Sequence, residues 1–271
     1  MPLDEWSARS CPVIGMLHAP PLPGSSGYEG SFAATRHAVL RDAEALIEGG
    51  VDGLMFENFG DAPFYPDRVP AVTVAAMTSL ASDLRWRFDV PLGINVLRND
   101  GRSALAIALA CGASLIRVNI LCGARVTDQG LLQGIAHDLL RDRANLRATS
   151  IQIWADVDVK HSAALADVSL HDEVRDVIDR GKADAVIVSG FATGQTVDQE
   201  TLRTVKRVAG VTPVIIGSGA TAETIRAMAP HANGVIVGSS LKHDGLAKNP
   251  VDVRRVKRFV ESARLRDANR G

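Results

Sequence analysis

The stretch Val13-Ile14-Gly15-Met16-Leu17-His18 is a short apolar run that ends in a polar side chain. Seven further apolar runs follow along the chain, and a longer amphipathic segment separates each run from the next. They span residues 53–56, 92–96, 114–119, 151–159, 185–188, 214–216 and 235–237. Apolar runs without regular alternation suit parallel strands that are buried on both faces. The sequence therefore predicts eight parallel strands, each followed by a helix.

Eight strand–helix units in one undivided chain predict an α/β fold of the (β/α)8 type, the TIM barrel. The 271 residues fit one such barrel. We expect a single domain over residues 1–271, with its core at 12–262. An open doubly wound sheet is the alternative, but it prefers a glycine-rich turn after the first strand, and G-x-G-x-x-G is absent there. In the fourth unit, residues 121–130 predict a long loop before a helix near 131–140.

The composition limits the classes of function. Lys plus Arg is 30 and Asp plus Glu is 31, so the formal net charge is −1. This balance lacks the basic excess of a nucleic-acid coat protein, and no nucleic-acid partner is expected. No run of 18 apolar residues and no secretory signal is recognisable, so we expect a cytoplasmic protein. The three cysteines form no C-x-x-C pair, which disfavours a disulfide scaffold or a cysteine zinc site.

Polar residues end almost every expected strand. Barrel enzymes build their sites at the carboxyl ends of the strands, and folding alone does not require polar residues there. Six of these side chains are candidates for binding a polar substrate: His18, Asn58, Asn95, Arg117, Asn119 and His161. A role in the fold is the alternative for some of them, since His18 could cap its strand and Arg117 could pair with Asp156.

Glycine and serine cluster at the ends of the last three expected strands. Loops after the seventh and eighth strands are the usual phosphate site of this fold, and glycines let backbone N–H groups approach an anion closely. We therefore expect an anion site there, with simple chain turning as the alternative. The predicted phosphate-binding residues are Ser189, Gly190, Gly217, Ser218, Gly219, Gly238, Ser239, Ser240 and Lys242.

The fifth expected strand supplies the predicted catalytic group. Side chains alternate along a strand, so Asp156, Asp158 and Lys160 are expected to share one face at the barrel mouth. In such a group the pKa values of the members can be shifted apart, so that one side chain acts as an acid and another as a base. Glu57, at the end of the second expected strand, is the fourth predicted catalytic residue. The three carboxylates could also hold Mg²⁺, whereas no organic cofactor is implied. A structural ion pair with Lys160 is the alternative.

Several longer strings together resemble the BtpA/SgcQ family of barrel proteins. They are VIGMLHAPPLPG at 13–24, GLMFEN at 53–58, GINVLRND at 93–100, RVN at 117–119, DVDVKH at 156–161, GSSLK at 238–242, and Asp244-Gly245. The resemblance implies a phosphate-binding TIM barrel. One branch of the family is linked to photosystem I biogenesis at the thylakoid surface, and other members resemble sugar or nucleoside catabolic enzymes, some of them named nucleosidases. No catalytic residue assignment comes with the resemblance.

Three functional hypotheses stay open. The first is an enzyme for a phosphorylated sugar or nucleotide-like substrate, such as a nucleosidase or other glycosidic-bond hydrolase, which uses carboxylates. The second is an aldolase or lyase with Lys160 as the Schiff-base lysine; it ranks lower, because neighbouring aspartates would raise the lysine pKa. The third is a non-catalytic assembly factor at a membrane surface. We expect a phosphorylated small molecule as partner, no stable membrane contact, and a homo-oligomer.

Overall fold

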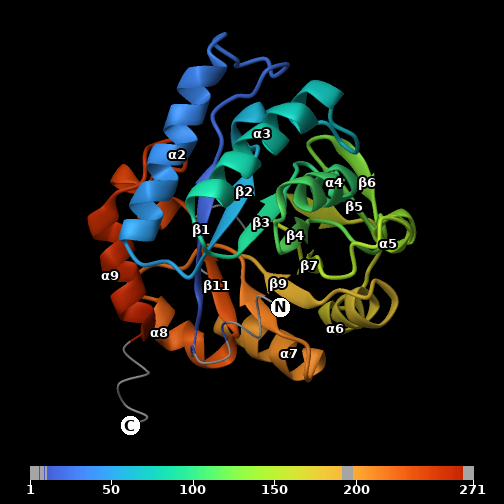
Figure 1. Ribbon diagram of the computed structural model, residues 1–271. Helices are drawn as coiled ribbons and strands as arrows, with labels where there is room; N and C mark the ends of the chain where they lie inside the picture. Colours follow the sequence, from blue (N-terminus) through green and yellow to red (C-terminus); the bar gives the residue numbers. More distant parts are fainter. Residues whose placement is uncertain (1–5, 7–8, 10, 191–197, 265–271) are drawn as a thin grey trace.

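Eight parallel strands close into a barrel in the computed structural model, which describes residues 6, 9, 11–190 and 198–264 (Figure 1). The strands are β1 (Val13–His18), β2 (Gly53–Glu57), β3 (Leu92–Asn95), β4 (Leu115–Val118), β7 (Gln152–Val157), β9 (Ala185–Val188), β10 (Val214–Ile216) and β11 (Gly234–Val237). They follow chain order around the ring, and β11 pairs with β1 to close it. The predicted TIM barrel and its eight strands are confirmed.

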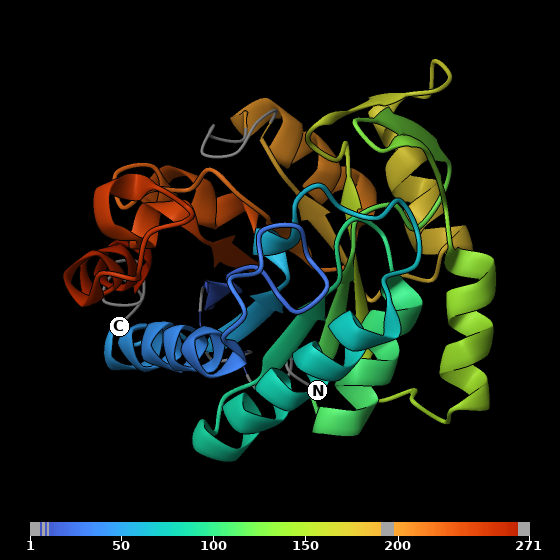
Figure 2. The same cartoon turned by 90° about the horizontal axis from the view of Figure 1, so that it is seen from above.

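Helices follow the strands and surround the barrel (Figure 2). They are α2 (Phe32–Glu48), α3 (Ala71–Arg87), α4 (Gly101–Cys111), α5 (Ala136–Asn145), α6 (Leu170–Arg175), α7 (Gln199–Ala209), α8 (Ile225–Met228) and α9 (Val253–Arg264). Side-chain caps fix several starts: Ser31, Asp100 and Ser169 each accept a hydrogen bond from a backbone N–H three residues ahead. These caps satisfy N–H groups that the helix itself leaves without partners.

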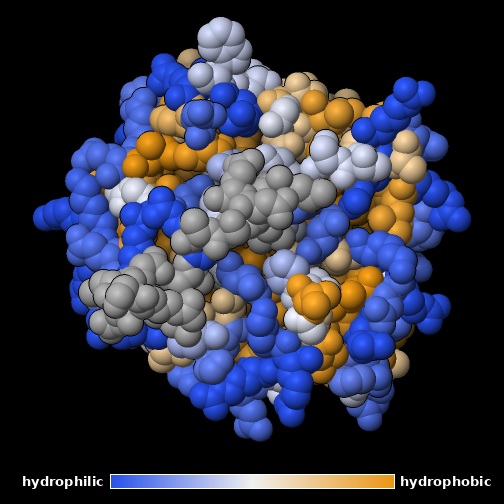
Figure 3. Space-filling model, turned by 60° about the horizontal axis from the view of Figure 1, so that its bottom comes forward, coloured by the Kyte–Doolittle hydropathy of each residue, from blue (hydrophilic) through white to orange (hydrophobic). Residues whose placement is uncertain are grey.

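The outer surface combines hydrophilic and apolar regions. The face shown in Figure 3 is mainly hydrophilic, with apolar side chains visible in separate patches. Within the described residues, no helix has the length and apolar character needed to cross a bilayer.

The segment after β4 differs from the predicted loop. β5 (Ala124–Thr127) and β6 (Gly130–Gln133) form an antiparallel hairpin, and β8 (Ser162–Ala164), from the loop after β7, pairs with β5. The helix predicted near 131–140 begins only at Ala136, because residues 130–133 belong to β6. The small sheet therefore ties the loop after β7 to the loop after β4.

Apolar side chains fill the lower part of the barrel interior. The cluster comprises Trp6, Ile14, Met16, Met55, Leu115, Trp154, Ala185, Ile187, Ile215 and Ile236. Trp6 lies edge-on to Trp154, with ring centroids 6.1 Å apart, and its indole N–H donates to the carbonyl of Asp52 at the amino end of β2. The packed lower interior leaves the carboxyl ends of the strands as the place for a site.

A polar layer lies above this apolar cluster. His18, Glu57, Asn95 and Arg117 are register neighbours on the adjacent strands β1, β2, β3 and β4. Each lies two residues beyond an inward position of the layer below, because side chains of one strand face alternate sides. The alternation of the strands thus brings four predicted site residues to one level.

Candidate functional site

A cavity of about 270 Å³ opens at the carboxyl ends of the strands. Its polar lining comprises His18, Glu57, Arg98, Arg117, Asn119, Lys160, His161, Gly217, Ser218, Gly219, Gly238, Ser239 and Ser240. Apolar side chains from the loops after β2 and β3, among them Phe59 and Phe64, complete the wall. The structure therefore brings together most of the residues that the sequence predicted for a site.

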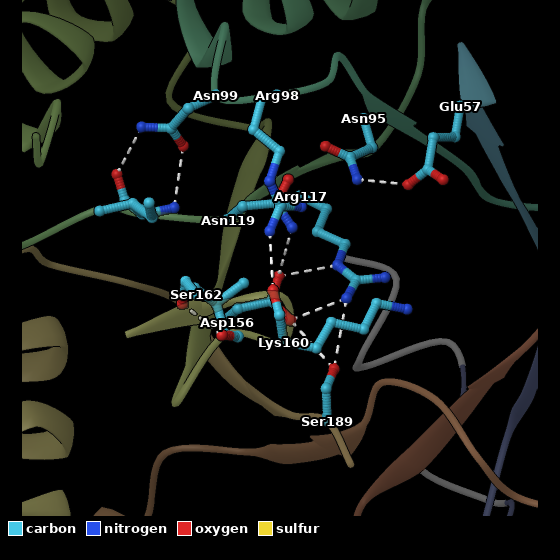
Figure 4. Close-up of polar contacts among 12 residues, drawn as sticks. Glu57, Asn95, Arg98, Asn99, Arg117, Asn119, Asp156, Lys160, Ser162 and Ser189 are labelled. Atoms are coloured by element: carbon cyan, nitrogen blue, oxygen red, sulfur yellow. Dashed lines mark hydrogen bonds and ion pairs between the residues drawn. The ribbon is translucent and has the colours of Figure 1, made fainter. Parts of the chain in front are cut away.

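Arg117 and Asp156 form a buried ion pair beneath the cavity (Figure 4). The guanidinium of Arg117 donates to both carboxylate oxygens, at 2.8 and 2.7 Å. Ser189 and Asn119 donate to the same carboxylate at 3.2 and 3.3 Å. Burial opposes the charge of Arg117, but Asp156 outweighs this effect and raises its pKa. The alternative interpretation of Arg117 is confirmed, and Asp156 and Ser189 hold it in place rather than line the cavity.

Glu57 presents the carboxylate that faces the cavity. Asn95 donates to its Oε2 atom at 2.6 Å, and the Nε2 atom of His18 lies 4.0 Å from its Oε1 atom. Burial, with Lys242 as the next cause, lowers the pKa of His18 to about 3, so its imidazole is neutral at physiological pH. The Nδ1 atom of His18 lies 3.3 Å from the carbonyl of Ala247, and because a carbonyl only accepts hydrogen bonds, Nδ1 carries the proton and donates. Nε2 therefore carries a lone pair on the cavity side.

Lys160 extends its side chain into the cavity beside the guanidinium of Arg117 (Figure 4). Burial lowers the pKa of Lys160, and the positive charge of Arg117 lowers it further against the opposing effect of Glu57 and Asp156. Asp156 does raise this pKa as expected, but burial and Arg117 outweigh it, so the expected net increase of the Lys160 pKa is wrong. Among the described residues, Lys160 forms no ion pair. His161, next in the chain, also lines the cavity, and burial lowers its pKa.

Asp158 does not share the face of Asp156 and Lys160. β7 ends at Val157, and Asp158 has a φ of 46°, so the alternation of the strand stops there. Its carboxylate lies 3.0 Å from Arg125 of β5, and its side chain is 44% exposed. The expected shared face is therefore wrong for Asp158.

The three predicted metal-binding carboxylates do not converge. Asp156 binds Arg117, Asp158 binds Arg125, and Glu57 faces the cavity. In the part of the chain that the structure describes, no three His, Cys, Asp or Glu side chains are grouped to hold a metal ion. The residues at these positions do not fit the Mg²⁺ site that the sequence suggested.

The loops after β10 and β11 form the glycine-serine wall of the cavity. A Cβ atom on Gly217 would lie 2.3 Å from a methyl carbon of Ile187, and Gly219 has a φ of +75°, so both positions require glycine. The buried hydroxyl of Ser218 has no hydrogen-bond partner among the described residues. Ser240 donates to the carbonyl of Ala220 at 2.9 Å and so joins the two loops.

Four other predicted residues lie outside the cavity, and one of them is Asn95, which binds Glu57 from beside it. Asn58 accepts from the backbone N–H of Leu97 at 2.7 Å and so fixes the loop after β3. Gly190 is buried behind β9 and is not part of the lining. The ammonium of Lys242 lies 3.2 Å from the carboxylate of Asp42 in α2 and is 2% exposed. The expectation that Lys242 supplies a charge to the phosphate loops is therefore wrong.

Arg98 is the cavity residue that sequence reasoning missed. It follows β3 by three residues, and its guanidinium donates to the carbonyl of Lys160 at 2.8 Å. Arg98 lies in the GINVLRND string, just beyond the end of an expected strand, and that position could have identified it as a candidate.

The family model described as "BtpA family" matches residues 9–265. The chain is 47% identical over 251 residues to the photosystem I biogenesis protein BtpA of Synechocystis sp., covering 93% of this chain and 87% of that protein. It is 46% identical over 253 residues to the uncharacterized protein TK2179 of Thermococcus kodakarensis, covering 93% and 95% of the two chains.

Solved barrel structures resemble the fold at low sequence identity. The (S)-3-O-geranylgeranylglyceryl phosphate synthase of Thermoplasma acidophilum, solved in complex with its substrate sn-glycerol-1-phosphate, superposes with a TM-score of 0.61. The alignment covers 97% of this chain and 96% of that chain, at 17% identity. At this low sequence identity, the similarity between the two structures shows a shared fold only.

Proposed function

The protein belongs to the BtpA family, and we propose that it is an enzyme that binds a small phosphorylated compound and transfers protons with Glu57 and Lys160. One observation carries the proposal. A buried carboxylate and a half-buried lysine without an ion-pair partner among the described residues line the same cavity as two glycine-serine loops. This combination is typical of a catalytic centre beside an anion subsite, and packing alone does not require it.

The phosphate is assigned to the loops 217–220 and 238–240. Glycines at 217 and 219 leave the backbone without side-chain cover, and the hydroxyl of Ser218 is free among the described residues to donate to an oxygen. A short 3-10 helix, η4 (Ser239–Leu241), begins directly after Gly238. Backbone N–H groups in such loops bind phosphate oxygens well. The glycerol phosphate bound by the synthase named above is a ligand of the same chemical kind.

Glu57 and Lys160 are the proposed acid–base pair. A general acid or base works best when its pKa lies near the pH of the reaction, and burial moves the pKa of Lys160 in that direction. Glu57 is oriented by Asn95, so its second oxygen can accept a substrate proton. Asn119 has a buried side-chain oxygen with no partner among the described residues, which suits a substrate hydroxyl.

Hydrolysis of a glycosidic bond with two carboxylates is less well supported. That reaction uses two carboxyl groups on either side of the bond. Of the carboxylates predicted for it, Glu57 alone lines the cavity, because Asp156 is bound by Arg117 and Asp158 turns to Arg125. A nucleosidase built on this site would need Lys160 as the proton donor to the leaving group.

A Schiff-base reaction is the second candidate, and the lowered pKa of Lys160 favours it. The amine nitrogen would bond to a substrate carbonyl carbon, and the carbonyl oxygen would leave as water. Borohydride in the presence of fructose 6-phosphate would then reduce the imine and leave a stable adduct on Lys160. An unchanged protein mass after this treatment, with binding of the sugar phosphate demonstrated, would exclude this candidate.

A non-catalytic assembly role is the third candidate, because one relative is named a photosystem I biogenesis protein. Contact with an anionic membrane would need free basic groups on α9. Lys257 and Arg258 of that helix instead pair with Glu48 and Glu223, which leaves Arg255 as the one basic residue of the run 254–258 without an ion pair to a described residue. We expect no flotation of the protein with anionic liposomes at physiological salt.

The proposed function is tested by thermal shift with matched sugars and sugar phosphates. A ligand that binds only the native state raises the melting temperature. We expect sugar phosphates to raise it and the matching free sugars not to do so. Glu57→Gln should keep this shift and lose turnover of the selected compound. Equal shifts with and without phosphate, or no shift at all, would contradict the proposal.

A further inference from the structure

Positive side chains line the cavity wall that faces the proposed phosphate loops. In the ring order β1-β11-β10-β9-β7-β4-β3-β2, β3 stands opposite β10 and β4 stands opposite β11. Arg98 follows β3, and Arg117 lies on β4. Lys160 follows β7, and its side chain extends beside the guanidinium of Arg117 (Figure 4). Arg117 reaches the first of the two loops, since its guanidinium lies 3.4 Å from the Cβ position of Gly217, whereas Arg98 starts from the strand opposite β10.

Arg98 differs from the other buried cations of the protein. Among the described residues, four cationic side chains are buried: Arg98, Arg117, Arg125 and Lys242. The last three each have a carboxylate partner. Arg98, with 6% of its surface exposed, forms no ion pair with any described residue.

The guanidinium of Arg98 keeps most of its hydrogen-bonding capacity. It has five N–H donors, and its one side-chain hydrogen bond within the described chain runs to the carbonyl of Lys160 at 2.8 Å. Lys160 lines the same cavity, and its ammonium, which extends beside Arg117 (Figure 4), has no ion-pair partner among the described residues either. A buried charge such as that of Arg98 is costly unless an anion neutralises it.

We propose that the ligand carries two anionic groups, a phosphate at the loops 217–220 and 238–240 and a second anion, a carboxylate or another phosphate, at Arg98 and Lys160. This inference rests on the proposed function, because it takes the phosphate loops as the first subsite. The planar guanidinium of Arg98 matches the two oxygens of such a group, and Lys160 adds a point charge. Asn119 lines the same cavity, and its side-chain oxygen, which has no partner among the described residues, would accept from a hydroxyl of the ligand.

Calorimetric titration with matched pairs of phosphate esters tests the second subsite. Glycerol 3-phosphate and 3-phosphoglycerate form a short pair, and sorbitol 6-phosphate and 6-phosphogluconate form a long pair; in each, the second compound adds a carboxylate. We expect the acid to bind about tenfold more tightly than the alcohol in at least one pair, the size of one charge-assisted hydrogen bond. Fructose 1,6-bisphosphate tests whether the second anion is a phosphate.

Arg98→Met should remove this preference and leave the affinity for the alcohol phosphates within about twofold of the wild-type value, because their phosphate does not touch Arg98. The control Arg87→Met removes an exposed arginine of α3 and should change neither affinity. If Arg98→Met does not fold, as judged by its melting curve, Arg98→Lys and Lys160→Gln carry the test and should each weaken binding of the acid selectively.

The outcomes separate the two proposals. Alcohol and acid phosphates that bind equally in both pairs, with no gain for the bisphosphate, overturn the second subsite and leave the phosphate site standing. A preference for the anionic compounds that survives Arg98→Met in the folded protein also overturns it. Failure of every phosphorylated probe to bind overturns the proposed function and, with it, the second subsite.

Discussion

Lys160 and Lys242 each lie a few residues beyond a barrel strand, β7 and β11, and burial lowers the pKa of both. Lys242 meets the carboxylate of Asp42 from α2 at 3.2 Å, on the outer side of the strand ring. Lys160 lines the cavity and has no ion-pair partner among the described residues. A lysine just beyond a strand end therefore stabilises the fold where a helix supplies a carboxylate, and is available to a ligand where none does.

Lys160→Met is the change with the largest expected effect. Loss of a general acid or base typically lowers kcat by about 100- to 10,000-fold, and we expect a loss in this range for the phosphorylated compound that the thermal-shift screen selects. The melting temperature should not fall, because the variant removes a half-buried charge that has no ion-pair partner among the described residues. A variant that keeps its turnover, or that unfolds at a lower temperature, would mean that Lys160 belongs to the fold.

Lys242→Met should show the opposite behaviour. It leaves Asp42 with only Arg41, whose side chain is half exposed, as a cationic partner, and loss of the buried partner typically costs up to about 3–5 kcal/mol. Urea denaturation at pH 7 measures this loss of unfolding free energy. The double variant with Asp42→Asn should recover part of it, because the buried carboxylate charge is then gone. A single variant as stable as the wild type would erase the distinction between the two lysines.

His18 adds a pH dependence to the comparison, since Lys242 is the second cause of its lowered pKa. Its pKa is about 3 in the folded protein against 6.5 in the unfolded chain. Below pH 6.5 the unfolded chain therefore binds a proton that the native protein does not. The unfolding free energy is therefore not reduced by His18 above pH 6.5. It falls as the pH drops toward 3, and the loss is about 2 kcal/mol at pH 5.

Denaturant melts at pH 7 and pH 5 measure this effect, and His18→Asn is the control that should lose this part of the difference. If the wild-type protein and the variant lost the same unfolding free energy between pH 7 and pH 5, His18 would be protonated in the native state at pH 5.

Gly219→Ala tests the anion loops that Lys160 faces. Gly219 has a φ of +75°, and Gly112, which ends α4 far along the chain, has a φ of +73° with nothing within 4 Å of its Cβ position. Alanine should cost each position about 1–2 kcal/mol of backbone strain. Gly219→Ala should also weaken binding of sugar phosphates, whereas Gly112→Ala should not. Equal affinities in calorimetry would remove the loops from the phosphate site.

Asp158→Asn should have the smallest effect. The side chain is 44% exposed and pairs with Arg125, and such a pair contributes about 1 kcal/mol or less. Turnover should stay within about threefold of the wild-type value, because the carboxylate does not face the cavity. A loss as large as that of Lys160→Met would restore the predicted carboxylate pair.

Much of the fold was predictable because its signals are local. Each strand is a continuous apolar run, and alternation along β2 and β4 was enough to aim Glu57 and Arg117 at the barrel mouth. The hairpin of β5 and β6 was missed because its strands are short and half exposed, with weak apolar patterning.

The site predictions that were wrong or missing concern residues that lie beyond the end of a strand. Alternation cannot be extended past Val157, since the positive φ of Asp158 turns that side chain away. The partner of Lys242 lies 200 residues earlier, and no local pattern indicates such a pair. The direction of Arg98 is set by a contact with the loop at Lys160, 62 residues further along the chain.

A crystal structure of the protein with bound 6-phosphogluconate tests the contrast between the two lysines most directly. We predict the phosphate at the backbone N–H groups of 217–220 and 238–240, the carboxylate on Arg98 and the ammonium of Lys160, and Lys242 still on Asp42. Electron density for the ligand outside the cavity would contradict this contrast between the two lysines. Lys160 bound to a protein carboxylate, with the ligand elsewhere, would contradict it as well.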